Sequence, residues 1–124
     1  MSKQNVVAAI IKKNNNYLIV QRNKKKHLGL KWEFPGGKVD KHESFIQALH
    51  REIQEELEIK ITIFKKIAIE KYKDETIDIT LHYYICNYKK GVMKLNEHEN
   101  FNWIKKEQFN EYDFVEGDKR VLSK

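Results

Sequence analysis

The 124-residue sequence predicts an α+β domain in which helices and strands pack as layers. Three observations carry this prediction. One long helix pattern begins near residue 44, two long strand patterns follow it, and a second, short helix pattern lies near the end of the chain. The length allows one hydrophobic core but not a second one, so we expect a single domain over residues 1–124.

Strands are expected where short apolar or β-branched runs are bounded by turn residues. The first two runs are separated by the turn signal Asn14-Asn15-Asn16, which predicts a hairpin. A second hairpin follows the helix, and its second strand alternates apolar and polar residues, which predicts one buried and one wetter face. Pro35 ends the third strand, after which Gly36-Gly37 turns the chain. The expected strands span residues 6–11, 17–20, 32–34, 61–72, 76–88, 92–95 and 101–104, with a basic loop over 22–30.

The long helix is expected to begin near Ser44. Ser44 and Gln47 have the spacing of a capping box, in which each side chain satisfies a backbone donor of the first turn. Apolar residues recur every four positions and form one stripe that should face the core. This stripe consists of Phe45, Leu49, Ile53 and Leu57, with Ile46 beside it. Shorter helical segments are expected at residues 105–112 and 117–124.

A second stripe on the same helix is acidic. Glu52, Glu55 and Glu56 are three or four residues apart, so their carboxylates share one edge of the helix. Like charges at this spacing repel one another, and a divalent cation would resolve the repulsion. Mg²⁺ takes oxygen ligands and usually binds through a few carboxylates together with substrate phosphates. The alternative is a solvated acidic face without a ligand.

The spacing around these glutamates is specific. Gly37 is followed after five residues by Glu43. After seven more residues comes the segment REIQEELEI, residues 51–59. This arrangement resembles the Nudix box of Nudix hydrolases, G-x5-E-x7-R-E-U-x-E-E-x-G-U, where U is aliphatic. One position departs, because Glu58 stands where the family has a glycine. Glycine suits a left-handed helix cap, so the glutamate implies a different helix ending.

The resemblance implies the Nudix fold, an α/β/α sandwich with a central mixed sheet and a loop-helix-loop that binds a divalent metal. It implies a hydrolase of nucleoside diphosphate derivatives that uses Mg²⁺, with Mn²⁺ as a possible substitute. Glu52 or another nearby carboxylate would accept a proton from the attacking water. Arg51 would orient the glutamates by bidentate hydrogen bonds. By this resemblance the catalytic residues are Glu52, Glu55 and Arg51, and the metal ligands within the box are the Gly37 carbonyl, Glu52, Glu55 and Glu56.

The segment WEFPGGKV resembles the MutT branch, whose members cleave nucleoside triphosphates to monophosphate and pyrophosphate. Glu97, six residues before Trp103, matches a metal-site glutamate outside the box, and Glu99 is the competing candidate. The branch implies a substrate such as 8-oxo-dGTP. The residues expected to contact substrate are Arg22, Phe34, Lys38 and Asp118. Three of them have a structural alternative: Phe34 as core, Lys38 as a solvated lysine and Asp118 as a residue that favours a helix N-terminus.

Composition limits the remaining readings. The net charge of +6 permits a basic nucleic-acid-binding module, but no array of aromatics interleaved with basic residues supports one. The basic cluster of Arg22, Lys24, Lys25, Lys26, His27 and Lys31 could attract a polyphosphate or simply be solvated.

No apolar run approaches the roughly 20 residues of a membrane span, and no signal-peptide layout is present, so we expect a cytoplasmic protein. It would act on a small nucleotide as a monomer or homodimer. The single cysteine, Cys86, is expected in the core. Another Nudix substrate stays open: a pyrimidine triphosphate, a dinucleoside polyphosphate, a nucleotide sugar or capped RNA. The nucleotide sugar is disfavoured because Pro35 is the only proline, and ADP-sugar members tend to carry one after the box.

Overall fold

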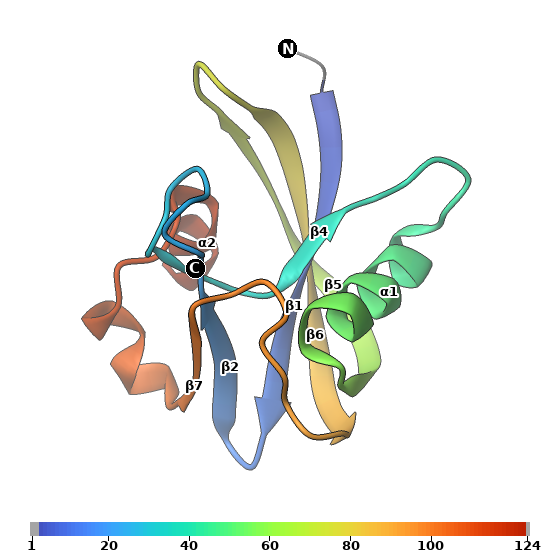
Figure 1. Ribbon diagram of the computed structural model, residues 1–124, viewed down its shortest axis with the longest axis vertical. Helices are drawn as coiled ribbons and strands as arrows, with labels where there is room; N and C mark the ends of the chain where they lie inside the picture. Colours follow the sequence, from blue (N-terminus) through green and yellow to red (C-terminus); the bar gives the residue numbers. More distant parts are fainter. Residues whose placement is uncertain (1–2, 124) are drawn as a thin grey trace.

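The computed structural model describes residues 3–123 and shows helices on both sides of a mixed sheet (Figure 1). The predicted α+β sandwich is therefore confirmed. The strands are β1 (Lys3–Lys13), β2 (Asn16–Gln21), β3 (Trp32–Glu33), β4 (Gly36–Lys38), β5 (Lys60–Lys73), β6 (Asp78–Lys90) and β7 (Asn100–Ile104). The helices are α1 (Phe45–Leu57), the 3₁₀ helix η1 (Lys106–Glu111) and α2 (Glu116–Leu122).

Strand β1 is the centre of the sheet. It runs parallel to β6 along most of its length and antiparallel to β2 and β4. Its two antiparallel partners occupy different parts of it, because β2 pairs with Lys12 and Lys13 whereas β4 pairs with residues 6–8. The sheet therefore divides beside the middle of β1. The predicted hairpins β1–β2 and β5–β6 are both present.

Each face of the sheet carries its own apolar cluster. On β1, Val7, Ala9 and Ile11 pack with Leu49, Ile53 and Leu57 of α1, whereas Ala8 and Ile10 pack with residues on the side of α2. Figure 1 shows α1 in green and α2 in red on opposite sides of the central strands. A strand buried on both faces reads as a continuous apolar run, which accounts for the sequence VVAAII.

The prediction of a wetter face on β6 is wrong. His82, Tyr84 and Cys86 lie on that face and are buried, because α1 and its neighbours cover it. The thiol of Cys86 is fully buried, and burial raises its pKa to about 12. On the opposite face, Ile79 and Leu81 are only half-buried, because they line a cavity described below.

Helix α1 begins as predicted. The Ser44 hydroxyl accepts from the Gln47 backbone N–H, and the Gln47 side chain accepts from the Ser44 N–H. The apolar stripe is also present, with one correction. Ile46, in the first turn, is 42% exposed, and Ala48 is buried instead.

The end of α1 differs from expectation. Glu58 adopts the left-handed conformation, with φ 56° and ψ 35°, so the helix ends as it would with glycine. The Glu58 N–H donates to the Gln54 carbonyl at 3.1 Å. The prediction of a different ending is therefore wrong. A non-glycine residue in this region carries a steric cost, which surrounding contacts must offset.

Those contacts come from residues 91–99. The predicted strand over 92–95 is absent, because this segment bonds to the end of α1 instead of to a strand. The Lys94 N–H donates to the Leu57 carbonyl and the Asn96 N–H to the Glu56 carbonyl, both at 3.0 Å. The Asn96 side-chain amide donates to the Glu55 carbonyl at 2.8 Å and to Glu58 Oε2 at 3.0 Å. Carbonyls that the helix leaves unpaired are thereby satisfied.

The remaining helices and strands differ little from those expected from the sequence. Strand β4 was expected as a turn, but its extended backbone pairs with β1. The short helix near 105–112 is a 3₁₀ helix, and α2 begins at Glu116, one residue earlier than expected. The last residue of the predicted terminal helix, Lys124, lies outside the described residues. Among residues 3–123, no helix has the length and apolar character needed to span a membrane.

Replacing Asn96 with alanine tests the contribution of the α1 cap. Asn96→Ala removes both side-chain hydrogen bonds to the helix end, so we expect the free energy of unfolding to fall by about 1–2 kcal/mol. Urea denaturation followed by circular dichroism measures this change. Asn110→Ala is the matched control, because Asn110 is exposed on η1. Equal midpoints for the two variants would contradict the capping role.

Candidate active site

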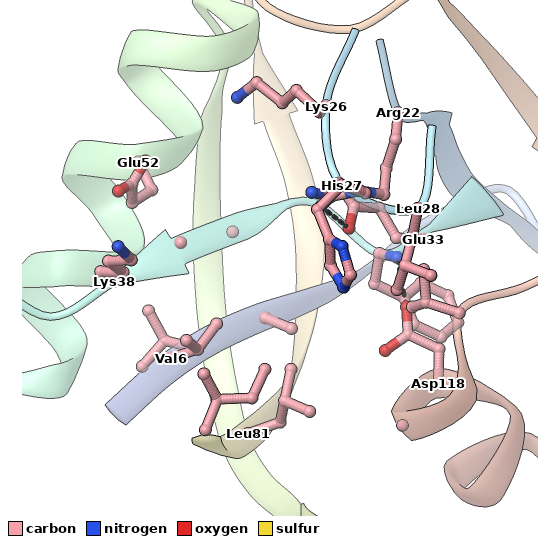
Figure 2. A pocket seen from close by; sticks show the side chains of 18 of the residues that line it. Val6, Arg22, Lys26, His27, Leu28, Glu33, Lys38, Glu52, Leu81 and Asp118 are labelled. Atoms are coloured by element: carbon pink, nitrogen blue, oxygen red, sulfur yellow. Dashed lines mark hydrogen bonds and ion pairs between the residues drawn. The ribbon is translucent and has the colours of Figure 1, made fainter. Parts of the chain in front are cut away.

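A cavity of about 490 Å³ opens where the sheet divides, beside β1, β4 and β6. Its lining residues come from these strands, from α1 and α2, and from the loops at residues 22–28 and 97–98. Figure 2 shows Glu52 and Lys38 on the side of α1 and β4, and Asp118 on the side of α2. Val6 of β1 and Leu81 of β6 also line the cavity. The cavity therefore has an acidic end and an end that is mainly apolar.

Gly37 and Glu52 meet closely at the acidic end. A Cβ atom on Gly37 would lie 2.4 Å from Oε2 of Glu52, so any other residue here would displace this carboxylate from its position. Glu52 is half-buried, and burial raises the pKa of its carboxyl group. The charge of Arg51 opposes this shift. The glycine position of the motif thus has a steric cause in the position of Glu52.

Glu56 is the most enclosed carboxylate at this end. It is 6% exposed, and its Oε1 has no hydrogen-bond partner among the described residues. Burial, followed by the charge of Glu52, raises the pKa of Glu56 to about 9. A buried carboxylate oxygen without a partner is unfavourable unless it binds a proton or a cation. This oxygen is therefore a suitable ligand for a divalent metal.

Arg51 organises the surrounding carboxylates. Its Nε donates to Glu43 Oε2 at 2.6 Å, and its Nη1 donates to Glu52 Oε2 at 3.3 Å and Glu55 Oε1 at 3.1 Å. Its Nη2 donates to the Lys38 carbonyl at 2.9 Å, which ties α1 to β4. Hydrogen bonding to Arg51 lowers the pKa of Glu43 to about 2. These contacts are the ones that a residue orienting the glutamates would make.

The predicted metal ligands do not all converge. Within residues 3–123, no three histidine, cysteine, aspartate or glutamate side chains lie close enough together to hold a metal ion as they stand. Glu55 is bonded to Arg51, and Glu97 Oε2 lies 3.4 Å from Lys26 Nζ. Both side chains are about half exposed. The donor set is made of oxygens and fits Mg²⁺.

The two candidates for the outer glutamate lie in different places. Glu97 lines the cavity, whereas Oε1 of Glu99 accepts from the Lys24 backbone N–H at 3.3 Å. This placement favours Glu97. Lys38 also lines the cavity, at its acidic end.

Asp118 is the buried carboxyl group at the other end. It is 2% exposed, and its two oxygens accept from the Phe34 N–H at 2.8 Å and from the Tyr83 hydroxyl. Burial nevertheless raises the pKa of Asp118 to about 7, against these hydrogen bonds. The N-cap of α2 is Val115, and Asp118 lies in the first turn of α2, so it does stand near a helix N-terminus as the structural alternative expected. Phe34 is 3% exposed, packs on Phe109 and Phe114, and also contributes to the cavity wall.

Three polar residues of the cavity region were not anticipated from the sequence. Glu33 accepts from Arg22 Nη1 at 2.9 Å and lies 3.1 Å from His98 Nε2, so Arg22 is paired rather than free. Tyr83 holds Asp118. Glu33 belongs to the segment WEFPGGKV and could have been noticed there. No spacing rule points to His98 or Tyr83, because both act through contacts distant in the sequence.

Comparison with known proteins identifies the family. The family model described as the NUDIX domain matches residues 1–124. The chain belongs to the Nudix family. It is similar to the CTP pyrophosphohydrolase of Escherichia coli, with 34% identity over 98% of this chain and 90% of that protein. It is also similar to the 8-oxo-dGTP diphosphatase of Buchnera aphidicola, with 31% identity over 98% of this chain and 92% of that protein.

A solved structure shows the same fold. The MutT protein of Methanosarcina mazei superposes with a TM-score of 0.89 at 21% identity, covering 98% of this chain and 91% of that one. The protein is thus a Nudix hydrolase, an enzyme that acts on nucleotide substrates. Nudix hydrolases generally use divalent metals.

The buried Glu56 carboxyl predicts how the stability of the metal-free Nudix hydrolase depends on pH. Its pKa rises from 4.5 to about 9 on folding. At pH values between 4.5 and about 9, the folded state therefore holds a proton that the unfolded state has released. The free energy of unfolding should therefore fall as pH rises through this window. Glu56→Gln should flatten the decline, because it removes the titrating group without changing the side-chain size.

Thermal unfolding in EDTA at pH 5, 7 and 9 measures this effect. The wild type should lose more of its melting temperature than Glu56→Gln across the series, and Mg²⁺ should restore part of the loss only in the wild type. Parallel pH profiles for the two proteins would show that Glu56 is not the titrating group.

Proposed function

We propose that this Nudix hydrolase is a Mg²⁺-dependent nucleoside triphosphate pyrophosphohydrolase that converts a (d)NTP and water to a (d)NMP and pyrophosphate. Oxidised purine nucleotides such as 8-oxo-dGTP are the proposed substrates. The observation that carries the proposal is the two-ended cavity. One end carries Glu52, Glu55, Glu56 and Glu97. The other holds apolar side chains, the Arg22–Glu33 ion pair and the buried carboxyl group of Asp118. A volume of about 490 Å³ suits a nucleotide-sized ligand.

At the acidic end, the Gly37 carbonyl, Glu52, Glu55, Glu56 and Glu97 would hold the metal. A bound divalent metal neutralises phosphate oxygens and acidifies the attacking water. Glu52 would accept the proton of that water. Arg51 fixes the direction of the Glu52 carboxylate through its Nη1. Lys38, on the adjacent strand β4, is placed to contact a phosphate.

At the apolar end, Phe34 and Leu81 provide a surface for the base, and Asp118 supplies a polar group at its edge. Both Asp118 oxygens already accept from protein donors, yet each carboxylate oxygen has a second lone pair. Asp118 can therefore accept from the N1–H and N2 amino group of guanine or 8-oxoguanine. When protonated, it can instead donate to O6. Arg22 contributes at the rim, where Glu33 holds its guanidinium.

A pyrimidine triphosphate is the second candidate substrate. The relative named CTP pyrophosphohydrolase aligns over 98% of this chain, as does the one named 8-oxo-dGTP diphosphatase. We also propose that the enzyme consists of one domain and works in the cytoplasm as a monomer or homodimer. A hydrolysis screen with Mg²⁺ over normal and oxidised NTPs and dNTPs, dinucleoside polyphosphates and nucleotide sugars tests the substrate class. Pyrophosphate and (d)NMP should be the primary products, and release of inorganic phosphate would overturn the proposal.

Glu52→Gln tests the general base. Glutamine keeps the shape beside Gly37 but cannot accept the proton, so kcat should fall at least ~100-fold with the fold intact. Glu55→Gln is the comparison, because its loss should chiefly weaken metal binding and be recovered by raised Mg²⁺. Steady-state kinetics at several Mg²⁺ concentrations separate the roles. Equal recovery of both variants by Mg²⁺ would contradict the assignment of Glu52.

Asp118→Asn tests base selection. Asparagine keeps an acceptor for one protein donor but changes the pattern presented to the base, so kcat/KM for 8-oxo-dGTP and dGTP should fall ~10-fold or more relative to dCTP. Tyr83→Phe is the control, since it removes the other partner of Asp118 without presenting a new group to the base. Its loss should be smaller and similar across bases. A uniform loss for Asp118→Asn would show that the residue supports the fold only.

A further inference from the structure

His98 is enclosed in the cavity wall, between the loop that carries Glu97 and strand β3. Its side chain is 6% exposed, and its Nε2 lies 3.1 Å from Glu33 Oε2. An ionised carboxylate only accepts hydrogen bonds, so Nε2 carries the hydrogen and donates it. Nδ1 is buried and has no partner among the described residues. The ring is therefore held in place by one polar contact, to Glu33.

Glu33 shares its two oxygens between two partners. Oε1 accepts from Arg22 Nη1 at 2.9 Å, while Oε2 accepts from His98. Arg22, Glu33 and His98 all line the cavity. A continuous polar chain therefore joins the proposed substrate-binding arginine to the residue beside the proposed metal ligand Glu97.

Glu97 itself has little support. Its side chain is 49% exposed, and it contacts Lys26 Nζ at 3.4 Å. Its loop has no helix or strand between residues 91 and 99. The main chain is fixed on either side, where the Asn96 N–H donates to the Glu56 carbonyl and the Glu99 N–H donates to the Gln21 carbonyl. Between these points, the buried ring of His98 is the side chain that anchors the loop to β3.

We propose that His98 is a positioning residue that holds the Glu97 loop and the Arg22 guanidinium in one fixed arrangement through Glu33. The metal carboxylate and the substrate-binding cation are then set as a unit before the nucleotide enters. A ligand group on an irregular loop loses conformational freedom when it binds, and a buried anchor reduces that loss. Residues that orient ligands in this way commonly affect metal affinity. The inference deepens the proposed function, because it rests on Glu97 as a metal ligand.

The test compares two substitutions of His98. Glutamine carries its amide nitrogen at a position that can still donate to Glu33, whereas leucine has a similar size and no donor. Mn²⁺ binding to the nucleotide-free protein is measured from the electron paramagnetic resonance signal of free Mn²⁺. We expect His98→Leu to weaken Mn²⁺ binding about 10-fold or more and to raise the nucleotide KM, with His98→Gln recovering most of both losses.

His82→Leu is the matched control. His82 is also buried, its Nε2 lies 3.0 Å from Asn5 Oδ1, and its Nδ1 also lacks a partner, but it is not among the residues that line the cavity. It should lose stability without losing Mn²⁺ affinity. If His98→Leu behaves like this control, His98 is only structural and the proposal is overturned. Equal weakening by His98→Gln and His98→Leu would overturn it too, because the hydrogen bond would then be irrelevant.

Two further measurements keep the test decisive. If His98→Leu does not fold, His98→Asn replaces it, since the shorter amide cannot reach Glu33, and the same comparison with His98→Gln applies. Glu33→Ala removes both acceptors and should reproduce the loss of Mn²⁺ affinity, so unchanged affinity would contradict the chain of contacts. A wild type that binds Mn²⁺ but releases no pyrophosphate from any triphosphate would refute the proposed function and leave the binding comparison intact. A wild type that binds no Mn²⁺ would overturn both.

Discussion

The guanidinium of Arg51 is the interaction on which the acidic end depends. It contacts the carboxylates of Glu43, Glu52 and Glu55 and, through the Lys38 carbonyl, the strand that carries Gly37. Without this cation, the carboxylates of Glu52 and Glu55 on α1 would repel each other and that of Glu43, which precedes the helix. The hydrogen bond to Glu43, together with the other carboxylates, raises the pKa of Arg51, so it stays charged. The fixed spacing of the motif thus has an electrostatic cause, in addition to the catalytic role that we propose for it.

The division of the sheet is the second constraint. Because β2 and β4 pair with different parts of β1, the sheet opens where α1 and α2 both approach it. This opening connects the acidic edge of α1 to the apolar region around Asp118 in a single cavity. Two chemically different ends therefore arise from one feature of strand pairing. The half-buried residues of β6, Ile79 and Leu81, follow from the same opening.

Local geometry explains which features could be predicted from the sequence. The capping box at Ser44, the apolar face of α1 and the hairpin at Asn14 depend on residues close together in the chain, and all three are present. Asn14 and Asn15 both have positive φ, as a tight hairpin turn requires.

Errors arose where distant residues decide the structure. Glu58 keeps a left-handed cap because Asn96, 38 residues further on, bonds to its side chain. The same contacts draw residues 92–95 away from a strand. The pairings of Glu33 with His98 and of Asp118 with Tyr83 also join distant segments, so no local pattern reveals them. For the metal ligands, the motif indicates which residues to consider, while their side-chain directions depend on Arg51 and Lys26.

The central claim is that the two ends of the cavity bind the two ends of one nucleotide. Backbone amide NMR of the labelled protein, titrated first with Mn²⁺ and then with 8-oxo-dGMP, tests it directly. Mn²⁺ should broaden the amides of residues 36–38 and 52–56, and the nucleotide should then shift those of Phe34 and residues 115–118. Broadening centred away from residues 36–38, 52–56 and 97, or nucleotide shifts confined to a surface outside this cavity, would contradict the account.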